Sequence, residues 1–226
     1  MYTIALDAGH GPNTAGKRTP MFDDGTFMHE YDFNNAVLKL LRARLSENGN
    51  FEVDVCSADG YDKLLSDRVK TEKFSDADLF LSIHANAMTG EWGNAKGIET
   101  FWNKGSSKGE KFAKIFQNNL VSDTGLYNRN AKSAPGPYYP TSLYVLRNTY
   151  APAVLIECGF MDNKVEASKL ITSEYRTLCS ESLYKSILEI FNVTDTLDYK
   201  SLYEAQKQEN KRLKAKLNSI HLESEV

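Results

Sequence analysis

Short apolar runs alternate along the chain with longer segments whose apolar residues recur at helical spacing. The run at 79–83, Leu-Phe-Leu-Ser-Ile, is apolar at four of its five positions and follows the turn-like segment 75–78. Such a run indicates a strand buried on both faces at the middle of an α/β sheet. His84 follows it directly, so we expect this side chain at the carboxyl edge of the sheet, where ligands bind in open α/β folds.

The same reasoning predicts the remaining elements. Strands are predicted at 2–6, 51–55, 97–101, 143–146 and 153–157, and helices at 30–45, 61–74, 108–121, 165–171 and 173–191. The Gly-, Pro-, Asn- and Tyr-rich stretch 125–141 is expected to be a loop that forms a wall of the cleft. Strands that alternate with helices predict an α/β fold with a mixed, mostly parallel central sheet flanked by helices.

The composition changes after Asn192, where Gly and Pro vanish and Lys, Glu and Gln dominate. We therefore predict a folded domain over 1–193 and a charged helical tail over 194–226. Apolar and neutral polar residues in the tail recur at spacings of three and four, which favours a short coiled coil and a homo-oligomer formed through residues 196–221. A solvated charged helix is the alternative, because three heptads are few.

Composition excludes several classes of partner. The chain has 226 residues, 41% of them hydrophobic, and a net charge of −3, which gives no support to nucleic acid or an anionic membrane as the main partner. No run approaches the roughly 18 apolar residues of a membrane span. Three widely spaced cysteines indicate reduced thiols. No basic segment followed by an apolar core opens the sequence, so we expect a protein made in the cytoplasm without a signal peptide.

Three residues from separate elements form a candidate metal site. His10 lies between two glycines after the first strand, Glu30 lies in the first turn of the first helix, and His84 ends a buried strand. Two imidazoles and one carboxylate are the ligand set of a catalytic Zn²⁺ (zinc) site that leaves one position open for water. His29 competes with Glu30, because neighbouring residues at a helix start point in different directions.

Glu157 is the candidate catalytic residue. It ends the apolar strand 153–157, where an unpaired charge is costly unless a metal ion or a proton compensates it. A carboxylate beside a metal-bound water is suited to accept its proton and later hand it to a leaving amine. Cys158 points to the opposite face if the strand continues, which indicates a buried thiol; a cysteine hydrolase built on Cys158 and His84 is the alternative.

Six segments resemble, in order, the motifs of the zinc-dependent N-acetylmuramoyl-L-alanine amidases of the Amidase_3 type. They are 8–11 (Ala-Gly-His-Gly), Glu30 with Asn34 and Asn35, 82–86 (Ser-Ile-His-Ala-Asn), 97–100 (Gly-Ile-Glu-Thr), 143–147 (Leu-Tyr-Val-Leu-Arg) and 152–163. The resemblance covers residues 2 to about 192. It implies a zinc amidase domain with zinc on His10, Glu30 and His84, Glu157 as the catalytic carboxylate, and peptidoglycan as the substrate.

The reaction that the resemblance implies is hydrolysis of the amide between N-acetylmuramic acid and L-alanine. A zinc peptidase acting within the stem peptides and a non-catalytic wall-binding module are the alternatives. Asn86 and Arg147 are candidate substrate-binding residues, although Asn86 is equally suited to cap the loop after its strand. Arg68 is expected to be a structural ion-pair partner.

The sequence departs from the family pattern at Asn130, where a glycine commonly follows the arginine, so the contact of this loop with glycan or peptide stays open. Export signals and wall-binding repeats, which many relatives carry, are not found. This pattern resembles phage or prophage endolysins, which reach the cell wall after release by a holin. We therefore expect an enzyme that acts on the wall after release.

Overall fold

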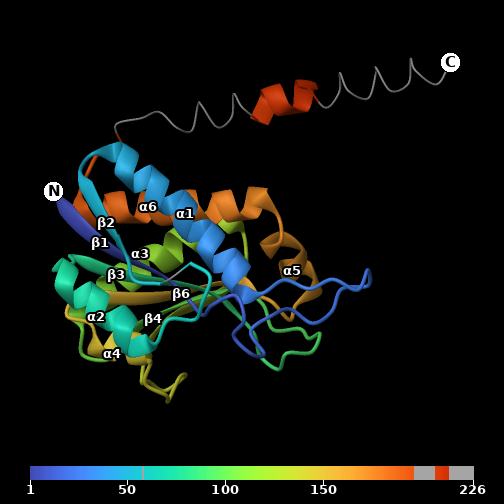
Figure 1. Ribbon diagram of the computed structural model, residues 1–226, viewed down its shortest axis with the longest axis horizontal. Helices are drawn as coiled ribbons and strands as arrows, with labels where there is room; N and C mark the ends of the chain where they lie inside the picture. The colour runs from blue at the N-terminus through green and yellow to red at the C-terminus, as the bar shows by residue number, and fades with distance from the viewer. Residues whose placement is uncertain (58, 196–206, 214–226) are drawn as a thin grey trace. The chain divides into compact units, whose positions relative to one another are not determined.

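A computed structural model describes residues 1–57, 59–195 and 207–213. The chain divides into two units, Met1–Val193 and Thr194–Val226. In the first unit, six strands form one sheet in the order β2-β1-β3-β6-β4-β5 (Figure 1). The strands are β1 (Tyr2–Ala8), β2 (Phe51–Val55), β3 (Leu79–Asn86), β4 (Ile98–Asn103), β5 (Asn128–Ala134) and β6 (Ala153–Phe160). Neighbours pair in parallel except β4 and β6, which are antiparallel, so the predicted mixed, mostly parallel sheet is confirmed.

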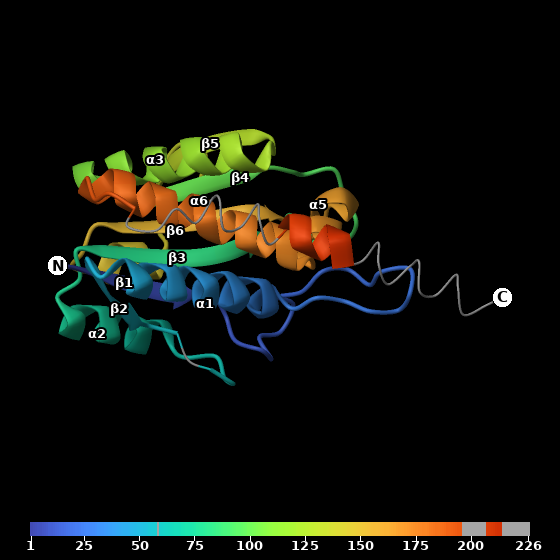
Figure 2. The ribbon, with the colours of Figure 1, turned by 90° about the horizontal axis from the view of Figure 1, so that it is seen from above.

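Helices cover both faces of the sheet. Those of the first unit are α1 (Glu30–Asn48), α2 (Leu65–Ser75), α3 (Ser107–Thr124), α4 (Tyr144–Asn148), α5 (Lys164–Leu170) and α6 (Ser173–Phe191). Figures 1 and 2 show α1, α3 and α6 on one face and α2 on the other, and Figure 1 shows α4 on the same side as α2. The predicted α/β class is therefore confirmed, with the longer helices gathered on a single face.

The alternation of side chains along the strands separates the apolar core from the polar groups. In β3, Leu81 and Ile83 belong to the larger apolar cluster, which α1, α3 and α6 also line, whereas Phe80 belongs to the smaller cluster shared with α2 and α4. Because successive side chains of a strand point to opposite faces, Ser82 and His84 lie on the same face as Phe80. The face under α2 and α4 therefore carries the polar residues at the carboxyl end of the strand.

The predicted strand at 143–146 is wrong. These residues instead lead into the short helix α4, which begins at Tyr144 after Leu143. Val145 and Leu146 are both buried in the smaller apolar cluster. A four-residue apolar run fits a buried strand and a buried helical turn equally well, so periodicity could not separate them.

The prediction of a loop over the whole of 125–141 is wrong in part, because residues Asn128–Ala134 form strand β5. This strand lies at the edge of the sheet, where β4 is its one partner among the described strands. Its sequence, NRNAKSA, is mostly polar, which fits an edge strand in which six of the seven residues are exposed or only partly buried. The hydrophobic pattern that identifies central strands is therefore missing from it.

The second unit is described at residues 194–195 and 207–213, and the latter are helical with exposed side chains. Arg212 Nε lies 3.1 Å from a carboxylate oxygen of Glu209, one turn earlier. The remainder of the predicted helix over 196–221 lies outside the described residues. Among the residues that the structure describes, no helix is long and apolar enough to cross a membrane.

Candidate metal centre and catalytic site

The structure brings His10, Glu30 and His84 together. One potential ligand atom from each lies within 4.8 Å of the other two. Glu30 Oε2 lies 3.2 Å from His10 Nε2, and Glu30 Oε1 lies 2.9 Å from His84 Nδ1. Two imidazole nitrogens and a carboxylate around one point are a donor set that fits a divalent transition metal ion, and zinc in particular.

The two glycines that flank His10 leave room for the neighbouring His84 ring and for the backbone of Asp62. A Cβ atom on Gly9 would lie 2.1 Å from Cε1 of the His84 ring, and a Cβ atom on Gly11 would lie 2.4 Å from the backbone of Asp62. His10 itself has a positive φ of 64°, a left-handed conformation that is uncommon for residues with a side chain. The turn after β1 thus requires glycine on both sides of the ligand.

Glu30 is held rigidly because it is the first residue of α1. Its N–H donates to Lys17 O at 2.9 Å, and its Oε1 accepts weakly from Ala85 N at 3.3 Å. Although burial alone would raise the pKa of Glu30, the hydrogen bonds and charges of His10 and His84 hold it well below its usual range. Glu30 is therefore an anion placed between two imidazoles.

The pKa of His84 shifts in the opposite direction to that of Glu30. Burial disfavours its charged form, but the hydrogen bond and charge of Glu30 outweigh burial and raise the pKa of the ring. A proton or a metal cation is thus attracted to the same place, and the two compete for the ring nitrogen that faces Glu30.

Glu157 lies beside this cluster. The register of the sheet pairs it with His84 on β3 and with Glu99 on β4. Its Oε2 atom is buried and has no hydrogen-bond partner among the described residues. Burial, assisted by the nearby charges of Glu30 and Glu99, raises the pKa of Glu157 to about 8, although the positive charge of His84 opposes the shift. A carboxyl group with a free oxygen and a pKa near neutrality is suited to proton transfer.

Glu99 is a buried member of the site that the sequence reasoning missed. Its Oε1 accepts from Asn86 Nδ2 at 2.6 Å, and its Oε2 accepts from Arg129 Nε at 3.0 Å and also from Lys132. The alternation of the predicted strand 97–101 could have identified it, since Ile98 and Thr100 are fully buried on the opposite face.

The two predicted substrate-binding residues have different surroundings. Asn86 holds Glu99, and its Oδ1 also accepts from the backbone N–H of Ala87 at 2.8 Å, which is the loop-capping contact that the sequence allowed. Arg147 is exposed on α4, where it donates to Ser142 and lies near the ring of Tyr144. Arg147 thus makes its contacts near its own helix, and the substrate roles of both residues stay predictions.

A cleft of about 420 Å³ opens beside the candidate metal ligands. Its polar lining includes His10, His84 and Ser82. Its apolar wall consists of Leu64, Leu65, Leu143, Tyr144, Val145 and Leu155. The cleft therefore joins the metal-binding corner to an apolar surface formed around α2 and α4.

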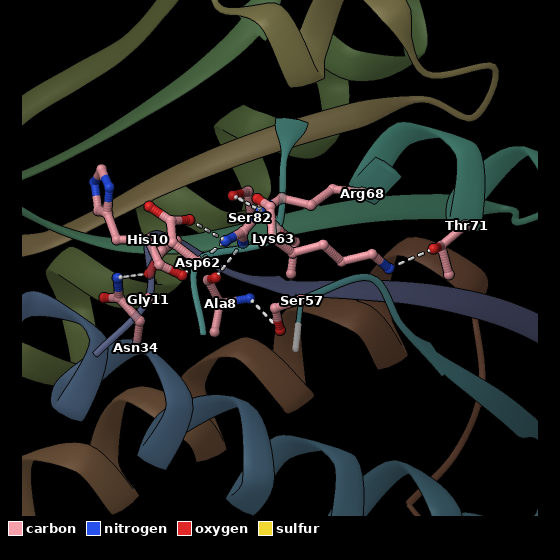
Figure 3. Close-up of polar contacts among 12 residues, drawn as sticks. Ala8, His10, Gly11, Asn34, Ser57, Asp62, Lys63, Arg68, Thr71 and Ser82 are labelled. Carbon is pink, nitrogen blue, oxygen red and sulfur yellow. Dashed lines mark hydrogen bonds and ion pairs between the residues drawn. The ribbon is translucent and has the colours of Figure 1, made fainter. Parts of the chain in front are cut away.

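Arg68 on α2 organises the floor of this cleft. Its guanidinium is buried and donates to Asp7 Oδ1 at 2.7 Å, to Asp62 Oδ1 at 3.0 Å and to the carbonyl of His10 at 2.7 Å. Figure 3 shows the Arg68 side chain extending toward Asp62 and Ala8, whose carbonyl it also contacts. The expected structural ion pair is present, and it also supports the turn that carries His10.

Replacing Arg68 by methionine is expected to destabilise the protein by about 3–5 kcal/mol, because removal of one partner leaves Asp7 as a buried, uncompensated charge. Urea denaturation at neutral pH measures the effect. Arg42→Met, at an exposed position of α1, is the control and is expected to change stability by less than about 0.5 kcal/mol. Equal midpoints for the two variants would contradict the assignment of Arg68 as a structural ion-pair centre.

Cys158 lies on the opposite side of β6 from Glu157, in the larger apolar cluster. It is fully buried as a free thiol, and its carbonyl accepts from Tyr175 Oη at 2.7 Å. A hydrogen bond with Cys179 and burial raise the pKa of the Cys158 thiol well above its ordinary value. These surroundings favour an inert core residue over a nucleophile.

An α/β sheet with a His, Glu, His donor set and a neighbouring carboxyl at its carboxyl edge defines a candidate metal-dependent hydrolase. Comparison with known proteins gives the family: the chain belongs to Amidase_3, N-acetylmuramoyl-L-alanine amidase, whose family model matches residues 4–189. Metal dependence is a known property of this family.

Several relatives of the chain are named as cell wall amidases or as an endolysin. The chain is 32% identical over 203 residues to an uncharacterised cell wall amidase of Bacillus anthracis, a match that covers 84% of this chain but 35% of that protein. It is 31% identical to the germination-specific N-acetylmuramoyl-L-alanine amidase of Bacillus subtilis, with 83% and 79% covered. It is also 31% identical to the endolysin of Bacillus phage SPP1, with 96% and 74% covered.

Solved structures agree with this placement. An N-acetylmuramoyl-L-alanine amidase of Clostridium difficile 630 matches with a TM-score of 0.74 and 30% identity, covering 84% of this chain and 97% of that one. The catalytic domain of the amidase CwlV of Bacillus (Paenibacillus) polymyxa matches with a TM-score of 0.74 and 28% identity, covering 86% and 100%. The first unit thus has the fold of an amidase catalytic domain.

Proposed function

We propose that this protein hydrolyses the amide between N-acetylmuramic acid and L-alanine in peptidoglycan, with zinc held by His10, Glu30 and His84. The observation that carries the proposal is the convergence of one ligand atom from each of these three side chains, within 4.8 Å of one another, beside a carboxyl oxygen of Glu157 that has no hydrogen-bond partner in the described part of the chain. Membership of the Amidase_3 family supports the choice of substrate.

Zinc bound at this site supplies Lewis-acid polarisation of the amide carbonyl and lowers the pKa of a water ligand to about 7. Glu157 is the general base and acid: its carboxylate accepts the proton of the attacking water, and the acid form hands a proton to the departing alanine nitrogen. In the metal-free site, burial raises the pKa of Glu157, and this environment favours the acid form that returns the proton. Asn86 and Arg147 are candidate contacts to the substrate.

Digestion of purified peptidoglycan tests the reaction. The expected products are new amino-terminal L-alanine residues without new reducing sugars, measured by amino-group labelling and a reducing-sugar assay. A muramidase digest of the same material is the control for the sugar assay. New amino termini other than L-alanine would identify a peptidase, and an intact polymer would identify a binding module.

The cell wall is the proposed place of action, since the relatives include cell wall amidases and a phage endolysin. We infer an endolysin-like role in which the enzyme reaches the wall after release at lysis. The similarity to the SPP1 endolysin, which extends over 96% of this chain, supports this role. Homo-oligomerisation through residues 196–221 stays a prediction of the sequence.

A further inference from the structure

Two cationic side chains from β5 lie beside the candidate catalytic residue. Glu99 on β4 pairs in register with Glu157 on β6, and Glu99 Oε2 accepts from Arg129 Nε at 3.0 Å and also from Lys132 Nζ. Because β4 is antiparallel to β6 and β5 is parallel to β4, the first residues of β4 and β5 lie at the carboxyl edge of β6. The start of β5 therefore belongs to the edge of the sheet that carries the candidate metal ligands.

An irregularity in strand pairing brings both cations to the same carboxylate. The register of β5 against β4 shifts by one residue at Glu99. Within this irregularity Asn130 has a left-handed φ of 68°, which asparagine adopts more readily than most residues, so it can replace the glycine that is common at this position of the family. In a regular strand, side chains three positions apart point to opposite faces. The extra residue thus allows Arg129 and Lys132 to reach Glu99 together.

The cluster of Glu99, Arg129 and Lys132 carries more positive than negative charge. Two cations and one carboxylate leave one positive charge, and the three side chains are only 7%, 25% and 17% exposed, in that order. An excess charge with limited access to water is costly without a counter-ion. The composition of the cluster therefore favours the binding of an anion.

Arg129 has hydrogen-bond donors left for such an anion. It meets Glu99 through Nε, and its two terminal nitrogens have no hydrogen-bond partner among the described residues. A guanidinium binds carboxylates in a bidentate manner through paired N–H groups. Arg129 can therefore hold Glu99 and a second carboxylate at the same time.

Neighbouring side chains fix the position of the guanidinium. Asn86 Nδ2 donates to Glu99 Oε1 at 2.6 Å, which limits rotation of the carboxylate that Arg129 contacts. The guanidinium carbon of Arg129 lies 4.8 Å from the centre of the Phe160 ring. Arg129 is thus held in place before an anion binds, so less conformational entropy is lost on binding.

We propose that Arg129 and Lys132, held by Glu99, form a subsite that binds a carboxylate of the stem peptide on the leaving-group side of the scissile amide. This inference rests on the proposed function. The carboxyl group of muramic acid is itself part of that amide, so the glycan side of the bond is neutral, whereas the peptide side carries carboxylates. An anion-binding subsite next to Glu157 therefore fits the peptide.

The dimensions of the sheet agree with this assignment. Strand β5 lies two strand spacings from β6, about 10 Å, and Arg129 reaches back across one of them to Glu99. Two extended peptide residues span at most about 7 Å. A carboxylate on the residue that follows L-alanine is therefore within reach of Arg129 when the scissile amide lies beside Glu157.

Chemically amidated peptidoglycan tests whether the subsite binds a negative charge. Carbodiimide coupling with excess ammonia converts the peptide carboxylates of purified peptidoglycan into neutral amides and leaves the muramoyl–L-alanine bond intact. At low polymer concentration, the wild type is expected to release amino-terminal L-alanine about 10-fold more slowly from the amidated polymer. Hydrogen bonds to charged groups contribute more than neutral ones, although partial exposure of the cluster weakens them.

Arg129→Gln and Lys132→Gln test the two residues separately. Each variant removes the excess positive charge but leaves Glu99 paired with the other cation, so no buried carboxylate loses its compensation. Both are expected to hydrolyse the native polymer about 10-fold more slowly than the wild type and to hydrolyse the amidated polymer at the wild-type rate. Arg42→Gln, which removes the same charge from an exposed position of α1, is the control and is expected to keep the wild-type preference.

Equal wild-type rates on the two polymers would overturn the proposal, as would retention of the wild-type preference in both cation variants. An equal loss of rate on both polymers in these variants would also overturn it, because the cluster would then have a structural role.

If the wild type cleaves neither polymer, the proposed reaction is refuted and a binding experiment decides the subsite. Titration with the dipeptide L-alanyl-D-glutamate is expected to shift the ¹⁵N signal of Arg129 Nε, which is assigned by its loss in Arg129→Gln. The neutral diamide of the same dipeptide is expected to leave that signal unchanged. A signal that responds to neither compound, or equally to both, would overturn the subsite.

Discussion

Glu157→Gln is expected to lower the rate of amide hydrolysis by roughly 10²- to 10⁴-fold, the usual contribution of a general acid–base group. Glutamine preserves the size of the side chain but can neither accept the proton of water nor return it to the leaving nitrogen. Release of L-alanine amino termini from purified peptidoglycan measures the rate, and bound zinc is measured in the same samples.

Glu47→Gln, at an exposed position of α1, is the matched control and is expected to keep wild-type activity. Retained activity in Glu157→Gln would show that proton transfer does not depend on this residue. Loss of zinc along with activity would instead assign Glu157 to the metal centre rather than to acid–base catalysis.

Because the pKa of Glu157 is raised, the stability of the metal-free protein is expected to depend on pH. An unfolded glutamate ionises near 4.5 and the folded one near 8, so the folded state binds more protons between these values and loses stability as pH rises through this range. Glutamine does not ionise, so Glu157→Gln removes this loss of stability. The variant is therefore expected to melt above the metal-free wild type at pH 8–9 and to melt with it near pH 4.

Chelation is expected to remove essentially all activity, and stoichiometric zinc is expected to restore it. The site has two imidazoles and one carboxylate within 4.8 Å, and in the proposed mechanism the activation of water depends on the ion that they hold. The measurements are metal content by elemental analysis, activity on peptidoglycan and thermal stability, which rises when a ligand binds only the folded state.

His84→Gln and His29→Gln form a matched pair for this experiment. His84 faces Glu30, whereas His29 lies at the start of α1 with its ring against Phe27, at a centroid distance of 5.1 Å. His84→Gln is expected to lose zinc and activity, and His29→Gln is expected to keep both. Full activity in a protein shown to be free of metal would contradict the zinc mechanism.

Much of the α/β pattern can be predicted from the chain because central strands are buried on both faces. The runs that lead to His84 and Glu157 are apolar except for Ser82, and each is followed by a polar residue near the carboxyl edge, which is how both candidates are found. The hydrophobic pattern does not predict strand β5 or helix α4. Strand β5 buries too little surface to need apolar residues, and helix α4 is too short for its apolar residues to recur at helical spacing.

The amino-acid sequence by itself determined the alternation of strands and helices and the placement of His10, Glu30, His84 and Glu157 near element ends, although β3 and β6 continue two and three residues beyond His84 and Glu157. Only the tertiary structure decided which groups surround them. Glu99 with its cations, and the hydrogen bonds of Asp7 with Arg68 and Ser82, join residues up to 75 positions apart. Such contacts depend on strand order and register, which are set by packing of the whole sheet and not by any local pattern.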